Sequence, residues 1–237
     1  MRQGVSAPPW NAFLGGYFFV GQRMNRVIFL VDGFNLYHSL IQAQKDAKGV
    51  TARWLDLEGL CSSFLPSIGR ISGRRVTLER IHYFSASPTH RDQGKQNRHA
   101  LYVRCLEATG SITVELGRFK SKRIWCGKCK RCFTAHEEKE TDVAIATRLF
   151  ETLHSNEAET VVLITGDTDL APSVRTCKRL FPTKGILFAF PYRRGNTELS
   201  RISPESFTIK LKVRLRHQLP DPFVLPHGVT LSKPKNW

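Results

Sequence analysis

The sequence predicts an α/β fold in which helices flank a central, mostly parallel sheet. Apolar, β-branched runs such as Val27–Val31 and Val161–Thr165 alternate along the chain with stretches of helical spacing. Strands that alternate with helices in this way build βαβ units. With 237 residues, the chain has the length of one such domain with additions.

The strands are expected where short apolar runs end at turn residues. Besides the two runs above, these are Val76–Phe84, Ile112–Phe119, Gly185–Phe190 and Phe207–Ile209. Helical spacing favours helices at Leu36–Lys45, Leu55–Leu65, Asp92–Thr109, Asp142–Leu153, Ala171–Leu180, Thr197–Ile202 and Lys210–Arg216.

Prolines and apolar spacing define two of these helices further. Pro66 is expected to end the helix Leu55–Leu65, whereas Pro172 lies in a first turn, where proline is tolerated. The apolar face of Asp142–Leu153 is expected to be carried by Val143, Ala146, Leu149 and Phe150.

Composition divides the chain into three segments. Residues 1–24, rich in Gly, Pro and aromatic side chains, are expected to be a disordered extension, and Met24 is an alternative start of translation. Residues 25–216 form the α/β domain, with a Cys-rich loop inserted at 118–136. Residues 217–237 are proline-rich, lack periodicity and are expected to be a C-terminal arm.

The charge of the chain favours a polyanionic partner. The formal net charge is +16 and the isoelectric point about 10.0, which favours nucleic acid first and an anionic membrane second. No apolar run approaches the roughly 20 residues of a transmembrane helix. The six cysteines do not form the pattern of a secreted disulfide framework, so we expect a cytoplasmic protein. The oligomeric state is open, and a homodimer is compatible with the sequence.

Acidic residues follow the predicted strands where ligands bind in open α/β sheets. Asp32 follows the first strand, Asp167 and Asp169 follow Val161–Thr165, and Asp142 begins a helix. At the carboxyl ends of strands, such a set is expected to hold Mg²⁺ or Mn²⁺. The alternative is that these acids and Asn35 only cap helices and turns, but neighbouring carboxylates repel unless a cation is present.

Three segments carry a resemblance to a known family. They are Val31-Asp32-Gly33-Phe34-Asn35, then residues 137–146 (Glu-Glu-Lys-Glu-Thr-Asp-Val-Ala-Ile-Ala), then residues 165–172 (Thr-Gly-Asp-Thr-Asp-Leu-Ala-Pro). In this order and spacing, residues 26–209 resemble the NYN-domain family, and within it the LabA-like branch of the PIN-like nuclease superfamily. Glu140 stands where that family often has glycine, which we expect to alter the local loop only.

The resemblance implies a PIN-like three-layer fold and Mg²⁺- or Mn²⁺-dependent cleavage of RNA, single-stranded or structured. It implies Asp32 and Asp167 as direct metal ligands, with Asp142 and Asp169 binding directly or through water. It implies a catalytic role for Asn35. Auxiliary roles fall to Glu138, Thr165 and Thr168. Two alternatives remain open: a non-catalytic RNA-binding or regulatory module, and another metal-dependent enzyme on the same scaffold.

The Cys-rich loop holds a candidate zinc site. Cys126, Cys129, Cys132 and His136 offer thiolate and imidazole ligands within eleven residues, and zinc takes such ligands in tetrahedral sets. Free thiols are the first alternative, and an iron–sulfur cluster or a redox disulfide is the second. A structural zinc ion there would staple the loop that carries Glu138 and Asp142.

Basic residues around this loop are expected to contact RNA through phosphates, with Trp125 stacking on bases. The candidates are Arg118, Lys120, Lys122, Arg123, Trp125, Lys128, Lys130 and Arg131, with Arg175, Arg193 and Arg194 as a second group. His82, His90, His99 and His154 show no ligand spacing and are expected at the surface or in packing.

Overall fold

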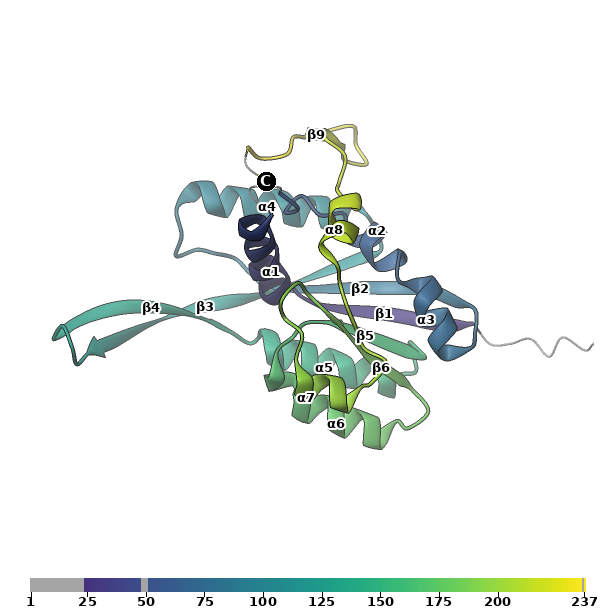
Figure 1. The fold of residues 1–237 in the computed structure, drawn as a ribbon. Coiled ribbons are helices and arrows are strands. Elements are labelled where there is room, and N and C mark those ends of the chain that lie inside the picture. Colours follow the sequence, from purple (N-terminus) through teal and green to yellow (C-terminus); the bar gives the residue numbers. More distant parts are fainter. Residues whose placement is uncertain (1–23, 48–50, 236) are drawn as a thin grey trace, which may run out of the picture.

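A computed structural model describes residues 24–47, 51–235 and 237, and in these residues one large sheet divides two layers of helices (Figure 1). The expectations about residues 1–23 lie outside the described residues. The strand order is β4-β3-β2-β1-β5-β6-β7, and every neighbouring pair is parallel except β3 and β4. The predicted α/β fold with a mostly parallel sheet is confirmed.

The strands are short in the body and long at one edge. They are β1 (Asn25–Asp32), β2 (Val76–Ala86), β3 (Ile112–Cys126), β4 (Arg131–Lys139), β5 (Thr160–Ile164), β6 (Gly185–Phe190) and β7 (Phe207–Thr208). The alternating side chains of β1 bury both faces of the sheet: Val27 and Phe29 enter one core, Ile28 and Leu30 the other. A strand that is covered on both faces has a continuous run of apolar residues, and this run is what allows β1 to be predicted from the sequence.

Two groups of helices cover the two faces. The core with Val27 and Phe29 receives side chains of α1 (Gly33–Asp46), α2 (Leu57–Ser62), α3 (Leu65–Ser72), α4 (Gln93–Ala108) and α8 (Leu211–Arg216). The core with Ile28 and Leu30 receives side chains of α5 (Thr141–His154), the 3₁₀ turn η1 (Thr168–Leu170), α6 (Ala171–Leu180) and α7 (Thr197–Ile202). None of the helices in the described residues combines the length and apolar character needed to cross a bilayer.

The C-terminal residues return to the first of these cores. The ring of Trp237 lies 6.3 Å from that of Trp54 and 5.9 Å from that of Tyr102, and the indole N–H of Trp54 donates to the carbonyl of Pro220 at 3.0 Å. Between Pro220 and Trp237 the chain forms a small hairpin of β8 (Phe223–Val224) and β9 (Thr230–Leu231). The arm is therefore ordered against the domain.

Two helix predictions need correction. Leu55–Leu65 is not one helix: Asp56 caps α2, which ends at Ser62, and Pro66 lies in the first turn of α3 rather than ending a helix. In α5, Val143 is 70% exposed and Phe150 43%, whereas Ile145 and Leu149 are buried. Leu149 and the partly buried Ala146 face the core as predicted, whereas Val143 and Phe150 do not, because the helix packs on Ile28 and Leu30 of β1 through Ile145 and Leu149.

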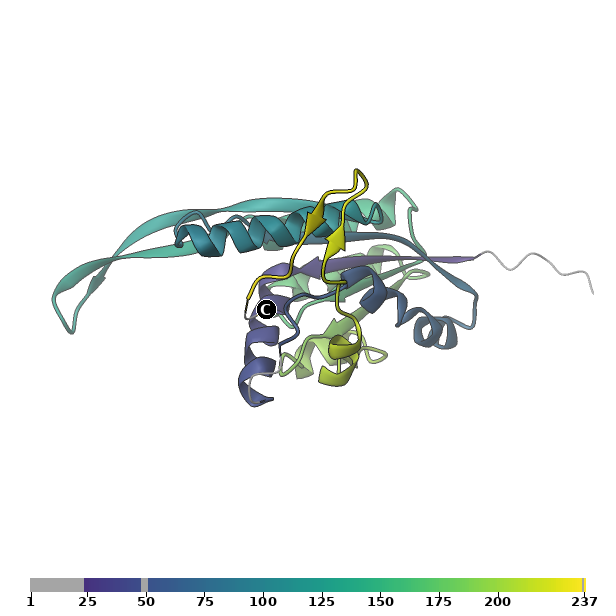
Figure 2. The same ribbon diagram turned by 90° about the horizontal axis from the view of Figure 1, so that it is seen from above.

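The predicted Cys-rich loop 118–136 is also wrong as a loop. Strand β3 does not end at Phe119 but runs on to Cys126, and β4 pairs with it antiparallel from Arg131 to Lys139. The two strands form a ribbon that projects from the body of the molecule (Figures 1 and 2). We call residues 118–139 the ribbon.

Candidate metal centre at the strand ends

Asp32 is fixed where β1 meets α1. Its side chain is 5% exposed and caps α1, since Oδ1 accepts the backbone N–H of Asn35 at 2.9 Å. Its other oxygen, Oδ2, accepts the hydroxyl of Thr165 at 2.9 Å. Aspartate is a preferred cap at this position, but the second hydrogen bond ties it to another strand.

Gly33 allows β2 to approach this turn. A Cβ atom at Gly33 would lie 2.6 Å from the carbonyl oxygen of Phe84 and 2.7 Å from the ring of Tyr83. Both contacts are far inside van der Waals distance, so any larger residue would displace the turn that carries Asp32. The glycine of the first motif is therefore a packing requirement.

The turn after β5 is joined to the start of α1. The hydroxyl of Thr165 donates to Asp32 and accepts the backbone N–H of Asp167 at 3.1 Å, and Thr165 is buried. The side-chain oxygen of Asn35 accepts the N–H of Gly166 at 3.2 Å. Asn35 and Thr165 thus position Asp32 and Asp167 relative to one another.

The third acid comes from the helix that follows the ribbon. Asp142 lies in the first turn of α5. Just before it, Glu138 Oε1 accepts the backbone N–H of Thr141 at 3.1 Å and also its hydroxyl. Glu140, between them, adopts φ 82°, the left-handed region that glycine favours, and its carboxylate pairs with Arg118 at 2.6 Å.

Carboxylate oxygens of Asp32, Asp142 and Asp167 lie within 4.8 Å of one another. Among the described residues this is the group of metal-capable side chains that the fold gathers. Asp169 and Thr168 are not part of it: Asp169 is exposed, and its N–H donates to Asp167 Oδ1 at 3.1 Å. We call Asp32, Asp142 and Asp167 the aspartate triad.

The triad carries uncompensated negative charge. Burial and, after it, the nearby charges of Asp167, Asp32, Glu138 and Asp169 together raise the pKa of Asp142 to about 6. Burial also raises the pKa of Asp32, against the hydrogen bonds from Asn35 and Thr165. A set of three close oxygen donors that repel one another fits a hard divalent cation such as Mg²⁺ or Mn²⁺.

The ribbon does not gather the predicted zinc ligands. Cys126 pairs with Arg131 and Trp125 with Cys132, so Cys126 and Cys132 point to opposite faces of the ribbon. His136 pairs with Ser121, about 13 Å along the strand from Cys132. Cys129 lies next to Cys126 and lowers its pKa through hydrogen bonds. Zinc binding stays a prediction, and in this structure it would involve fewer than these four ligands.

Many of the predicted RNA-contacting residues are engaged in ion pairs. Arg118 pairs with Glu140, Lys122 with Glu137 at 3.8 Å, Arg175 with Glu198, and Arg193 with Asp46 at 3.1 Å. Trp125, in contrast, is 61% exposed near the ribbon tip. The backbone oxygen of Arg194 would meet any Cβ atom placed on Gly166, so this arginine lies against the turn before Asp167.

Sequence reasoning missed the rings beside the triad. His90 packs as expected, and its partners are rings from the ribbon: it stacks on His136 at 4.5 Å and meets Phe119 edge-on at 4.3 Å. Phe119 in turn lies 5.5 Å from Phe34, next to Asn35. These contacts join segments far apart in the chain, so no local sequence pattern predicts them.

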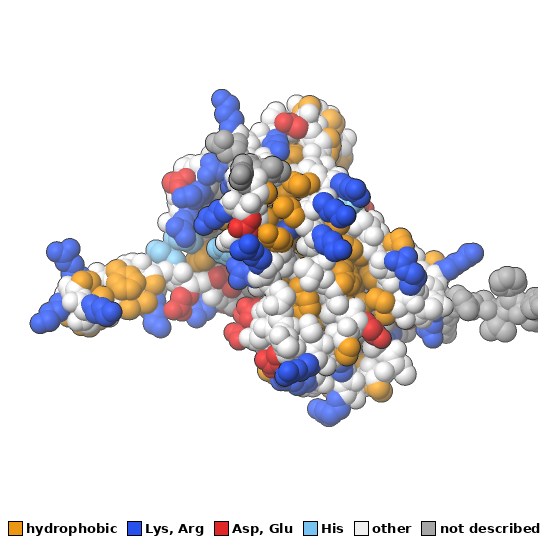
Figure 3. Space-filling model, viewed as in Figure 1, with side chains coloured by type: hydrophobic (Ala, Val, Ile, Leu, Met, Phe, Trp, Pro, Cys, Tyr) orange, Lys and Arg blue, Asp and Glu red, His pale blue; other side chains and the backbone are white. Residues whose placement is uncertain are grey.

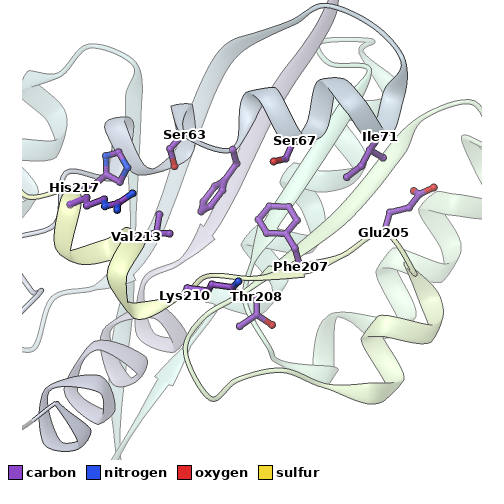
Figure 4. Close-up of a pocket in the computed structure, with 11 residues that line it drawn as sticks. Ser63, Ser67, Ile71, Glu205, Phe207, Thr208, Lys210, Val213 and His217 are labelled. Atoms are coloured by element: carbon purple, nitrogen blue, oxygen red, sulfur yellow. The ribbon is translucent and has the colours of Figure 1, made fainter.

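A separate groove lies away from the triad. It has a volume of about 450 Å³ between α3, β7 and α8, and Figure 4 shows Phe207, Lys210 and His217 among its lining residues. No residue of the triad lines it. The acidic centre thus lies at the carboxyl ends of β1 and β5 and is separate from this groove.

The fold and the triad define an α/β protein with an acidic centre at the carboxyl ends of parallel strands. The family model of the NYN domain matches residues 26–208, more than half of the chain, and the chain belongs to this family. The expected family membership is confirmed.

A similar solved structure is a protein of unknown function from Vibrio parahaemolyticus, with 15% identity, a TM-score of 0.49, and coverage of 79% of this chain and 94% of that chain. A search of curated proteins returned no match.

We predict that Asp142→Asn stabilises the metal-free protein at pH 7.5. The pKa of Asp142 is raised from 3.8 to about 6 in the folded state, so its ionised form is disfavoured there. The penalty is complete above pH 6 and disappears below pH 3.8. After allowance for solvent screening and the favourable helix dipole, we expect a gain of about 1 kcal/mol.

Denaturant unfolding in chelator at pH 7.5 and pH 5 measures this gain, with the exposed Glu107→Gln on α4 as the matched control. The gain should shrink at pH 5. A variant that is less stable than the wild type at pH 7.5, or a gain that does not depend on pH, would contradict the electrostatic account.

We predict that Glu140→Gly is more stable than Glu140→Ala. Both variants lose the ion pair with Arg118, so they differ in how they tolerate φ 82°. An alanine there costs about 1 kcal/mol more than glycine. Thermal or denaturant unfolding of the two variants measures the difference, and equal stability would rule out the left-handed conformation.

Proposed function

We propose that this protein is a metal-dependent ribonuclease that hydrolyses RNA phosphodiester bonds. The observation that carries the proposal is the aspartate triad, three carboxylates within 4.8 Å at the edge of an NYN domain. The net charge of +16 supports a polyanionic substrate. An acidic centre in a basic protein is what phosphodiester chemistry requires, because the cation has to be held and the substrate attracted.

Asp32, Asp142 and Asp167 would hold the cation. Bound there, Mg²⁺ or Mn²⁺ supplies an activated water and neutralises charge that develops on the scissile phosphate. Thr165 keeps Asp32 oriented by donating a hydrogen bond to Oδ2, while Oδ1 accepts the backbone N–H of Asn35. Asn35 holds the turn of Gly166, and with it Asp167, through its side-chain oxygen.

The other predicted residues take outer positions in this proposal. Asp169 is exposed and adjoins the triad through Asp167, where it would act through water. Glu138 caps α5 and sets the position of Asp142, while its charge adds to the negative field. Thr168 begins the 3₁₀ turn that follows Asp167.

The cleavage test uses labelled single-stranded and structured RNA with Mn²⁺ or Mg²⁺. We expect Asp32→Asn and Asp167→Asn to lose at least about 100-fold in rate, because each removes a ligand worth several kcal/mol of charge stabilisation. Asp169→Asn should lose less, since Asp169 lies outside the triad. Glu107→Gln, exposed on α4, should keep the wild-type rate.

Unchanged cleavage by both Asp32→Asn and Asp167→Asn would refute the site. RNA binding by the wild type without cleavage under any metal condition would refute the activity and leave an RNA-binding module on the NYN fold.

A further inference from the structure

The two faces of the ribbon differ in chemistry. Side chains of paired strands alternate between faces, and paired residues share one. One face carries Phe119, Ser121, Arg123 and Trp125 on β3, with Cys132, Thr134, His136 and Glu138 on β4. We call it the site face, because Glu138 reaches the start of α5 and adds to the charge around Asp142.

Part of the positive charge on the opposite face is engaged in ion pairs. Lys122 and Lys139 both bind Glu137, the latter at 2.8 Å, and Arg118 binds Glu140. Its aromatic residue, Phe133, is 51% exposed. Three basic residues on the face away from the triad, Arg118, Lys122 and Lys139, are therefore engaged in ion pairs, whereas Lys120 and Arg131 on the same face are exposed.

A row of rings runs from the site face to the first turn of α1, which follows Asp32. Phe34, two residues after Asp32, meets Phe119 edge-on at 5.5 Å, and Phe119 meets His90 at 4.3 Å. His90 stacks on His136 at 4.5 Å with an interplanar angle of 15°. All four rings are partly or fully exposed. Figure 3 shows histidine side chains gathered where the ribbon joins the body.

Two arginines, Arg91 and Arg194, lie near this row of rings. Arg91 adjoins His90 in sequence, and both Arg91 and Arg194 are close enough to lower the pKa of His38 on α1, where burial has the larger effect. Burial, followed by the charges of His136 and Arg91, also lowers the pKa of His90, which favours a neutral ring that can stack. The path from ribbon to triad thus combines stacking surfaces with charges that suit phosphates.

We propose that the site face and its row of rings form the docking surface for a single-stranded nucleic acid that leads into the aspartate triad. The proposal rests on the proposed function for the identity of that strand as RNA. Unpaired bases stack on Trp125, His136, His90 and Phe119, while Arg123 and Arg91 contact phosphates. A duplex keeps its bases stacked inside, so it does not use these rings.

The ribbon sets the length of this surface. From Phe119 to Trp125 the strand rises about 20 Å, which matches about six stacked nucleotides at roughly 3.4 Å each. A strand shorter than this can fill the triad end but not reach Trp125. Longer single strands are therefore expected to bind more tightly up to that length.

The ribbon offers a matched pair of aromatic residues for the test. Trp125 and Phe133 are both exposed near its tip but lie on opposite faces. Binding of fluorescent 12-nucleotide single-stranded RNA, the same sequence in DNA, and a 12-base-pair RNA duplex is measured by anisotropy with Mn²⁺ in the Asp167→Asn background. That background separates binding from cleavage, which is assayed independently in the wild-type protein.

Trp125→Ala and His90→Ala should each weaken single-strand binding by about 5- to 150-fold, with duplex binding little changed. Phe133→Ala should stay within about twofold, and thermal melts should show all three variants folded. Preference for either single strand over the duplex supports the surface, and the RNA and DNA arms report which sugar it accepts.

Equal losses for Trp125→Ala and Phe133→Ala, or no loss for Trp125→Ala and His90→Ala, would overturn the proposal. Tighter binding of duplex than of both single strands would also overturn it. If the wild type cleaves no RNA but the face-specific losses are found, the proposed function fails while the docking surface stands.

Discussion

The structure depends on one hydroxyl that joins two strand ends. Thr165 Oγ1 donates to Asp32 Oδ2 and accepts the backbone N–H of Asp167, and it is buried. Because β1 and β5 are neighbours in the sheet, the carboxylates that follow them would approach in any case. The threonine fixes the geometry of that approach by hydrogen-bonding to the side chain of Asp32 and to the backbone of Asp167.

The third carboxylate is set by a different part of the chain. Asp142 reaches the triad because α5 begins where the ribbon returns to the body, with Glu138 capping the helix and Glu140 in the left-handed region. The ribbon therefore links the position of a metal ligand to a surface that extends away from the body. A substrate that binds the ribbon would act on the segment that leads into α5 and Asp142.

The strand-end acids were predictable because their strands are apolar on both faces. Val27–Val31 and Val161–Ile164 are buried throughout, so the runs and the acids that follow them stand out in the sequence. The ribbon was not predictable in this way. Its residues are exposed on both faces, so no alternation of apolar and polar residues marks strands beyond Phe119.

Other errors came from signals with two meanings. A proline such as Pro66 is compatible with the end of one helix or with the first turn of the next. In the structure Asp56 caps the short helix α2, and Pro66 lies in the first turn of α3. In α5, Val143 and Phe150 were predicted on the buried face with Ala146 and Leu149, but the contacts with β1 select Ile145 beside Leu149. The stacking of His90 on His136 joins the turn before α4 to the ribbon. It is a tertiary contact, which no local sequence pattern predicts.

The central claim is that Asp32, Asp142 and Asp167 form a preassembled site for a divalent cation. Titration of Mn²⁺ followed by its electron paramagnetic resonance signal tests this directly, comparing the wild type with one Asp→Asn variant at each triad position at pH 7.5. The account predicts saturable binding in the wild type that weakens at least about tenfold in each variant. Mn²⁺ binding of equal affinity in the wild type and in all three variants would contradict it.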